Sequence, residues 1–199
     1  MKKLLTIVMA LALAIVACVS CGNTSSSDNG SQKQTVKAGL ITLHDENSTY
    51  DKNFIDAFKA ACTAKGIDYT IKSGIPEGNE CYDAAAELAD AGCNFIFADS
   101  FGHESFLLRA AKEFPNVQFS HATGTTAHTE NQANFHNAFA SIYEGRYVAG
   151  VAAGLKLKDM MEKDSSVKPV IGYVGAYTYA EVISGYTSWY LGVKSIVPE

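Results

Sequence analysis

Side chains that could bind or transform a small molecule are concentrated in four short segments of the chain. Each segment combines hydrogen-bonding groups with aromatic rings, and the four cover residues 44–50, 99–103, 121–128 and 177–179. Carboxylates and amides orient a polar ligand, and tyrosine or phenylalanine rings stack on planar groups. We therefore ask whether these segments form a catalytic centre, a metal site or a binding pocket.

The carboxylates of the first segment are the main candidates for catalysis. Asp45, Glu46 and Asp51 could form an acid–base set, with Asp45 and Asp51 as the pair that a nucleoside hydrolase would need. Alternatively, the segment is a solvated loop in which Asp51 caps the following helix. The chain has no P-loop, GxSxG or HExxH motif, and the GYVG at residues 172–175 lacks the third glycine of a dinucleotide-binding loop. We therefore expect no enzyme activity and no cofactor.

The histidines and cysteines do not have the spacing of a metal site, and we expect none. No two of the five histidines lie at i, i+4 on one predicted helix. The cysteines beyond the N-terminal region, at positions 62, 81 and 93, are odd in number, which favours buried small hydrophobic residues over a disulfide. The net charge of −5 argues against a nucleic-acid partner, because phosphate binding needs a clustered basic surface.

Strands and helices alternate along the rest of the sequence. Continuous apolar runs predict strands, and apolar residues at helical spacing followed by glycine or proline predict helices. This alternation predicts an α/β fold with a doubly wound parallel sheet, whose ligands sit at the carboxyl ends of the strands. Strands are expected over residues 36–43, 67–71, 94–98, 117–121, 134–139 and 170–174, and helices over 51–65, 80–91, 103–113, 142–157 and 181–193.

The chain divides into five predicted regions. The first α/β lobe is expected over residues 36–158, a charged connection over 159–169, and the start of a second lobe over 170–199. Before them, residues 22–35 are polar and rich in serine, asparagine and glycine, which is typical of a flexible tether. One strand and one helix cannot bury their own faces, so the second lobe is expected to be only begun.

Residues 1–21 have the pattern of a lipoprotein signal peptide. Two lysines precede an apolar run that is shorter than the ~20 residues of a membrane-spanning helix. The motif Ile15-Val16-Ala17-Cys18 fits a bacterial lipobox, in which the cysteine thiol takes the lipid. Cys21 is a competing site, and an ordinary signal peptide with bystander cysteines is the alternative. We expect a protein anchored by lipid at the outer face of a bacterial cell membrane.

The first loop and several later segments resemble the basic membrane protein family, the lipid-anchored substrate-binding proteins of ABC transporters also described as purine nucleoside receptors. The loop reads DENSTYDKNF from Asp45 to Phe54, close to the family's first-lobe ligand loop. Further similar segments are FIFADSF at 95–101, IYEGRY at 142–147 and IGYVG at 171–175. The resemblance implies a type I periplasmic-binding-protein clamshell that closes on a purine nucleoside or base and delivers it to an ABC permease.

The resemblance also implies a set of ligand-binding residues. Phe54 matches the aromatic residue that stacks on the purine ring, and Asp45 matches an acidic ligand contact. Thr123 occupies the position of a family aspartate, and Ile55 that of an asparagine, so the hydrogen-bonding groups of the pocket differ from the family pattern. With the loops at the strand ends, the expected site comprises Asp45, Asn47, Tyr50, Asp51, Phe54, Asp99, Ser100, His121, Thr123, Tyr177 and Tyr179.

Two other functions compete with import. A membrane-surface sensor could use the same clamshell, and a secreted nucleoside hydrolase could use Asp45 with Asp51. The lipobox favours import over a DNA-binding regulator, because a regulator would carry a basic helical head and no signal peptide.

Overall fold

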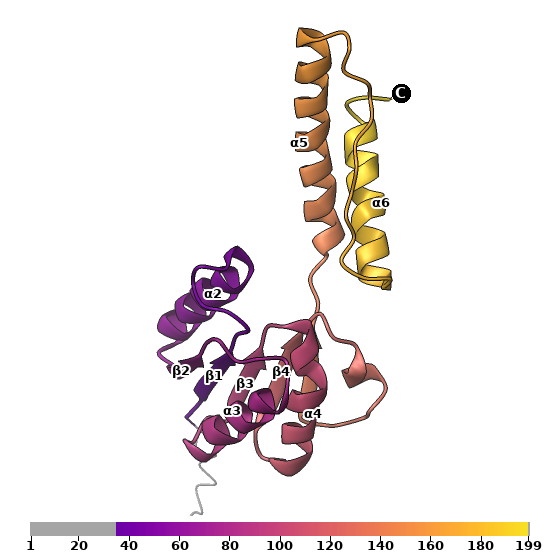
Figure 1. Ribbon diagram of the computed structural model, residues 1–199. Coiled ribbons are helices and arrows are strands. Elements are labelled where there is room, and N and C mark those ends of the chain that lie inside the picture. The colour runs from indigo at the N-terminus through magenta and orange to yellow at the C-terminus, as the bar shows by residue number, and fades with distance from the viewer. Residues whose placement is uncertain (1–34, 199) are drawn as a thin grey trace, which may run out of the picture. The chain divides into compact units, whose positions relative to one another are not determined.

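The computed structural model describes residues 35–198. From β1 to α5 its strands and helices alternate as the sequence predicts, and Figure 1 shows their arrangement. In chain order they are β1 (Lys37–Ile41), α2 (Thr49–Lys65), β2 (Asp68–Lys72), α3 (Asn79–Asp90), β3 (Phe95–Ala98), a 3-10 helix (Phe101–His103), α4 (Glu104–Glu113), β4 (Gln118–Ala122), a second 3-10 helix (Thr126–His128), β5 (Phe135–Ala138), α5 (Ile142–Lys163) and α6 (Ala180–Lys194).

The strands form one parallel sheet in the order β2-β1-β3-β4-β5. Parallel strands need helical crossovers and are covered on both faces, so their side chains are apolar on both sides. Alternate residues of β1 show this, because Gly39 faces Leu88 of α3 whereas Leu40 lines a groove with α2 residues. The predicted doubly wound sheet is confirmed, and all five strand C-termini lie at one edge.

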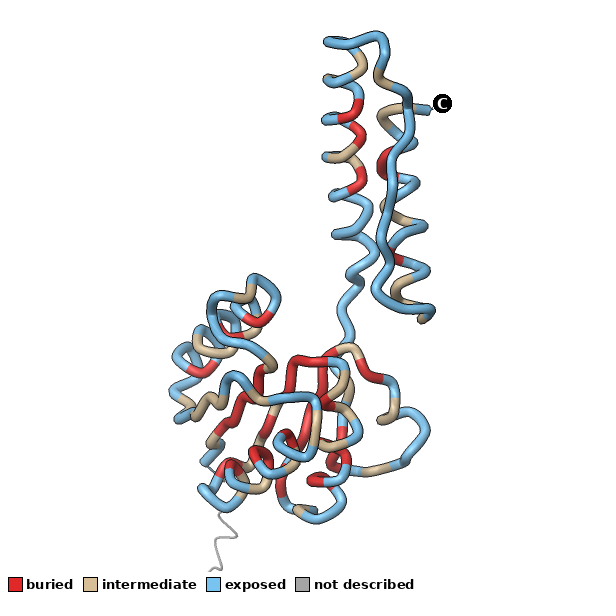
Figure 2. Tube along the Cα trace, viewed as in Figure 1, coloured by how far each residue is buried: buried red, intermediate tan, exposed pale blue. Residues whose placement is uncertain are grey.

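The main core lies between the sheet and the helices α3 and α4, where Figure 2 shows the buried positions concentrated. Short side chains on the helices let them approach the sheet closely, and Leu88, Ile96 and Phe119 are almost completely buried there. Cys81 and Cys93 pack in this same core, and Cys62 is buried on α2, all three as free thiols. The prediction that these cysteines act as small hydrophobic residues is confirmed.

Helix α2 begins two residues earlier than the sequence pattern predicts. Ser48 is its N-cap and accepts a hydrogen bond from the backbone N–H of Asp51, which places Asp51 inside the first turn. The helix ends at Gly66, whose φ of 62° is left-handed backbone that glycine adopts without a steric penalty. The cap thus sets the position of the residues that leave β1.

Helix α5 packs against α6 through small residues. A Cβ added at Gly150 would lie 2.1 Å from the carbonyl oxygen of Trp189, and one at Gly192 would lie 2.2 Å from that of Tyr147. The two backbones therefore touch directly at this crossing. Helix α5 was expected to belong to the first lobe, but its extensive packing is with α6, whereas α2, α3 and α4 cover the sheet.

Two predictions for the region after α5 are wrong. The helix continues to Lys163, through part of the segment expected to be a connection, with an ion pair between Lys163 and Asp159 in its last turn. Residues 170–174 do not form the expected buried strand, and Val170 and Val174 are 79% and 97% exposed. Apolar composition alone does not make a strand, because the backbone also needs a neighbouring strand for its hydrogen bonds, and none pairs with this segment in the described part of the chain.

The predicted signal peptide, both candidate lipidation cysteines and nearly all of the predicted tether lie outside the described residues. Within residues 35–198, no helix combines the length and the apolar character needed to cross a bilayer.

Candidate functional site

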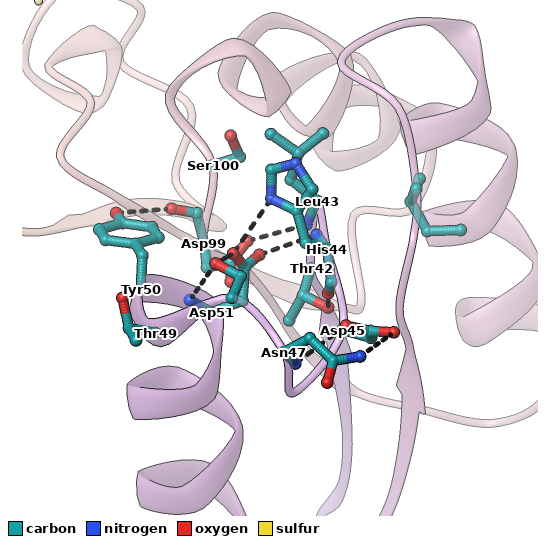
Figure 3. A network of polar contacts seen from close by, with 12 residues as sticks. Thr42, Leu43, His44, Asp45, Asn47, Thr49, Tyr50, Asp51, Asp99 and Ser100 are labelled. Carbon is teal, nitrogen blue, oxygen red and sulfur yellow. Dashed lines mark hydrogen bonds and ion pairs between the residues drawn. The ribbon is translucent and has the colours of Figure 1, made fainter.

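The loops after β1 and β3 meet beside the N-terminus of α2, at the carboxyl edge of the sheet. Figure 3 shows the polar network that joins them. The loop after β1 folds over the first turn of α2, and the loop after β3 begins with Asp99 and Ser100. Two segments that are about 50 residues apart in the sequence thus supply one cluster of polar groups, as the strand order requires.

Asp51 is the centre of this network and is buried. Its carboxylate accepts hydrogen bonds from the backbone N–H of His44, at 2.9 Å, and from the hydroxyl of Ser48, and it lies 3.2 Å from Nδ1 of the His44 ring. Burial opposes ionisation, but the hydrogen bonds from Ser48 and His44 outweigh it and hold the pKa of Asp51 below its usual value. Asp51 therefore closes the loop onto the helix.

Asp99 lies next to Asp51 and is completely buried. Its Oδ1 accepts a hydrogen bond from the backbone N–H of Leu43 at 3.3 Å, and its carbonyl oxygen accepts one from the Tyr50 hydroxyl at 3.0 Å. Burial and the neighbouring charge of Asp51 raise the pKa of Asp99 to about 7. An ionised Asp99 would leave Oδ2 without a partner, whereas a protonated one can donate to Asp51.

The groups around Asp51 include a serine and a histidine, but not in the arrangement of a nucleophilic triad. A triad needs the serine hydroxyl on the histidine and the histidine on the carboxylate. Here both Ser48 and His44 contact Asp51. The serine proton is thus held by the carboxylate, and this arrangement does not activate the hydroxyl for attack.

The exposed groups of the site belong to the loop after β1 and to the first turn of α2. Asp45 is exposed and accepts hydrogen bonds from the backbone N–H and the side-chain amide of Asn47, at 2.9 and 3.1 Å. Tyr50 is 48% exposed, and its hydroxyl is tied to Asp99. Burial and the charges of Asp99 and Asp51 raise the pKa of Tyr50 to about 12, so its hydroxyl stays protonated near neutral pH. These three side chains can meet a ligand without any rearrangement of the core.

Other predicted ligand residues support the loops instead. The hydroxyl of Ser100 donates to Glu77 at 2.6 Å, and the carbonyl oxygen of Ser100 accepts a hydrogen bond from Nε2 of His121 at 2.7 Å. Both side chains are buried, His121 completely. Desolvation lowers the pKa of His121, which keeps the ring neutral in this environment. Sequence analysis did not select Glu77, although it lies in a loop after a strand.

The remaining predicted residues make other contacts. Phe54 is one turn further along α2 than Tyr50, and its ring lies 5.0 Å, between centroids, from the Tyr50 ring. It also lines an apolar groove of about 320 Å³ with Leu40 and Phe97. Thr123 follows β4 in left-handed backbone, with a φ of 63°.

Tyr177 and Tyr179 lie in the segment before α6. Tyr177 lines an open groove with other residues of this segment and of α6, and the Tyr179 ring contacts that of Phe101, with centroids 5.6 Å apart.

Metal ligands do not cluster in the described part of the chain, where no group of three or more His, Cys, Asp or Glu side chains could hold an ion. At the carboxyl edge the chain exposes carboxylate, amide and tyrosine groups together.

Comparison with known proteins agrees with this arrangement. The model of the family described as "ABC transporter substrate-binding protein PnrA-like" matches residues 39–198. A purine-binding protein of Brucella abortus is 34% identical over 133 residues, which are 67% of this chain and 34% of that protein. A Haloferax volcanii protein whose description names it an ABC transporter glucose-binding protein is 31% identical over 113 residues, 57% of this chain and 26% of that one. The chain thus spans about a third or less of these relatives.

Solved structures show the same fold at lower identity. A solute-binding protein of an ABC transporter from Conexibacter woesei has a TM-score of 0.59 at 20% identity, covering 82% of this chain and 51% of its own. One from Aeropyrum pernix has a TM-score of 0.65 at 12% identity, covering 82% and 44%. These likenesses support the clamshell fold class.

Proposed function

Because this chain belongs to the family of PnrA-like ABC transporter substrate-binding proteins, we propose that it binds a purine nucleoside or base and delivers it to an ABC permease. It does so from the outer face of a bacterial cell membrane, held there by a lipid on Cys18 or Cys21. The ligand is clamped between two lobes, of which the sheet described here forms the first. It carries out no reaction on the ligand.

One observation supports the step from family membership to a purine ligand. Asp45, Asn47 and Tyr50 present a carboxylate, an amide and an aromatic ring together at the carboxyl edge of the sheet. A carboxylate accepts hydrogen bonds from ring N–H or ribose hydroxyl groups, and an aromatic ring stacks on a planar base. The identity to a purine-binding relative points in the same direction.

The hydrogen bonding and burial of the polar groups support binding of the ligand without a reaction on it. Ser48 and His44 are both engaged by Asp51, and the buried carboxyls Asp51 and Asp99 face each other instead of the solvent. Neither is placed to abstract a proton from a ligand at the exposed edge.

The test is isothermal titration of the full-length protein with adenosine, inosine, adenine, hypoxanthine and glucose. We expect at least one purine to bind. Chromatography of the recovered ligand should show that the protein has not converted it. Glucose is included because one relative is described as glucose-binding. Binding of glucose with no purine binding would contradict the proposed ligand class, and a changed nucleoside would contradict the proposed absence of catalysis.

A matched pair of variants tests the loop. Asp45→Asn should weaken purine binding by about 1.5–3 kcal/mol, the worth of a hydrogen bond to a charged group. Asp56→Asn removes an exposed carboxylate from helix α2, further from the edge, and should bind as the parent does. Equal affinity of all three proteins would remove Asp45 from the site.

A further inference from the structure

The loop after β4 begins with a backbone conformation that its residue type disfavours. Thr123 has a φ of 63°, in the left-handed region, where a β-branched side chain is strained. Its backbone N–H donates to the carbonyl oxygen of Ala138, the last residue of β5, at 3.1 Å. Strain of this kind persists only where the surrounding structure holds the residue in place, and it is common at ligand sites. The contacts of the loop therefore show what holds Thr123 in this conformation.

A carboxylate of α4 holds this loop. Oε1 of Glu104, the first residue of α4, accepts hydrogen bonds from the backbone N–H of Thr126 at 2.9 Å and from the side-chain amide of Asn137 at 3.0 Å. The amide oxygen of Asn137 in turn accepts one from the backbone N–H of Ala127 at 2.8 Å. Burial opposes ionisation of Glu104, but the hydrogen bonds from Thr126 and Asn137 outweigh it and hold the pKa of Glu104 below its usual value. Two successive N–H groups of the loop are thus fixed, one directly and one through Asn137.

The loop also lies directly against the Glu104 carboxylate. Gly124 is buried, and a Cβ there would lie 2.1 Å from Oε1 of Glu104 and 2.4 Å from Nδ1 of His121, so only glycine leaves this space. The same His121 donates from Nε2 to the carbonyl oxygen of Ser100, in the loop after β3, at 2.7 Å. The loops after β3 and β4 and the end of β5 are therefore joined around one carboxylate at the carboxyl edge of the sheet.

We propose that Glu104 is a positioning residue of the ligand site, and that it acts through Thr123 by holding the loop 123–128 in its binding conformation. This inference rests on the proposed function and on the expectation that Thr123 contacts the ligand. Glu104 is not itself a ligand contact, because its side chain is only 16% exposed and its Oε1 atom is already shared by two donors inside the fold. A loop that is fixed before the ligand arrives binds it without the entropic cost of being ordered.

The experiment separates the reach of the Glu104 side chain from its charge. The full-length parent, Glu104→Gln and Glu104→Asp are titrated calorimetrically with adenosine, inosine, adenine and hypoxanthine. Glutamine keeps the reach and an oxygen that accepts both hydrogen bonds, so we expect this variant to bind within about twofold of the parent. Aspartate keeps the charge that suits the first turn of a helix but is one methylene shorter. A loop that then holds its binding conformation only about a tenth of the time binds about tenfold more weakly.

The opposite order of affinities would overturn the positioning role. If Glu104→Asp binds as tightly as the parent and Glu104→Gln is weakened, the charge matters and the reach does not. The control is Glu113→Asp, which shortens an exposed carboxylate bonded to Tyr82 at the other end of α4 and should leave affinity unchanged.

A double variant shows whether the effect passes through Thr123. Thr123→Ala should weaken binding of the same purines. In that background Glu104→Asp should cause little further loss, because the contact that Glu104 positions is already gone. Losses that multiply in the double variant would mean that Glu104 acts independently of Thr123, and the inference would be wrong in that part.

The outcomes separate the inference from the proposed function. If the parent binds a purine and Glu104→Asp binds it equally well, the loop does not need Glu104 and the inference alone is wrong. If the parent binds none of the four purines, the proposed function fails and the inference fails with it.

Discussion

At the scale of single residues, the distinctive feature is a pair of buried carboxyls, Asp51 and Asp99, at the start of the site. The hydrogen bonds of Ser48 and His44 keep Asp51 ionised, while burial and the charge of Asp51 raise the pKa of Asp99 to about 7. Asp51 ties the loop that carries Asp45 to the first turn of α2, and Asp99 lies beside it just after β3.

This pair predicts how stability depends on pH. The folded state keeps the Asp99 proton up to about pH 7, whereas the unfolded chain releases it near pH 3.9. Between these values the folded state binds more protons, so the contribution of Asp99 to stability falls as pH rises and is lost above pH 7. Asp99→Asn removes this term, so the melting temperature of the variant relative to the parent should increase from pH 4 to pH 7 and then level off.

Parent and variant must be compared by the difference in their melting temperatures, because two buried histidines change stability in the opposite direction as pH rises. Desolvation lowers the pKa values of His103 and His121, so their contribution to stability is gained as pH rises toward the ordinary histidine range. Both proteins share that term, and it cancels. Scanning calorimetry of parent and Asp99→Asn from pH 4 to pH 8 provides the measurement; a constant difference in melting temperature would show that Asp99 does not titrate as inferred.

At the scale of elements, the α5–α6 contact is set by glycine. Alanine at position 150 would bring a methyl group against the carbonyl of Trp189, a backbone atom that cannot rotate away. We expect Gly150→Ala to lower the free energy of unfolding by about 1–3 kcal/mol, the usual cost of overpacking, in spite of the better helix propensity of alanine.

Gly145 offers a matched control on the same helix. A Cβ there would meet only the end of the Ile142 side chain, at 3.9 Å. Gly145→Ala should therefore stabilise the helix by up to about 1 kcal/mol. Urea titration followed by circular dichroism at 222 nm checks both variants. Equal stability of the two would mean that the helices do not approach closely at Gly150.

At the scale of the whole molecule, the predicted lipid anchor decides where the protein works. Changing both Cys18 and Cys21 to serine should move the protein from the membrane fraction to the soluble fraction and abolish labelling by a palmitate analogue. Each single substitution then identifies the lipidated residue. Changing Cys62, which is buried in the fold, serves as the control and should leave fractionation unchanged. A double variant that stays with the membrane would contradict the lipoprotein proposal.

The layered architecture of the sheet and its helices follows from the amino-acid pattern alone. Apolar runs of four or five residues, each followed by a helical pattern and a glycine or proline stop, specify parallel strands and crossovers because no other arrangement buries both faces of each strand. Ligands of such sheets sit at the carboxyl edge, and this rule alone predicts Asp45, Asn47, Tyr50 and Asp99 as site residues.

Which of those groups are exposed at the carboxyl edge depends on the tertiary structure. Burial and hydrogen bonding depend on neighbours that are distant in sequence. Ser100 is engaged by His121 and by Glu77, and Phe54 lines the groove beside Phe97. Residues 170–174 make the same point for secondary structure, since their apolar composition suits a strand but a strand requires a partner. Residue type sets what a side chain can do, and the packing around it determines which of those options remains.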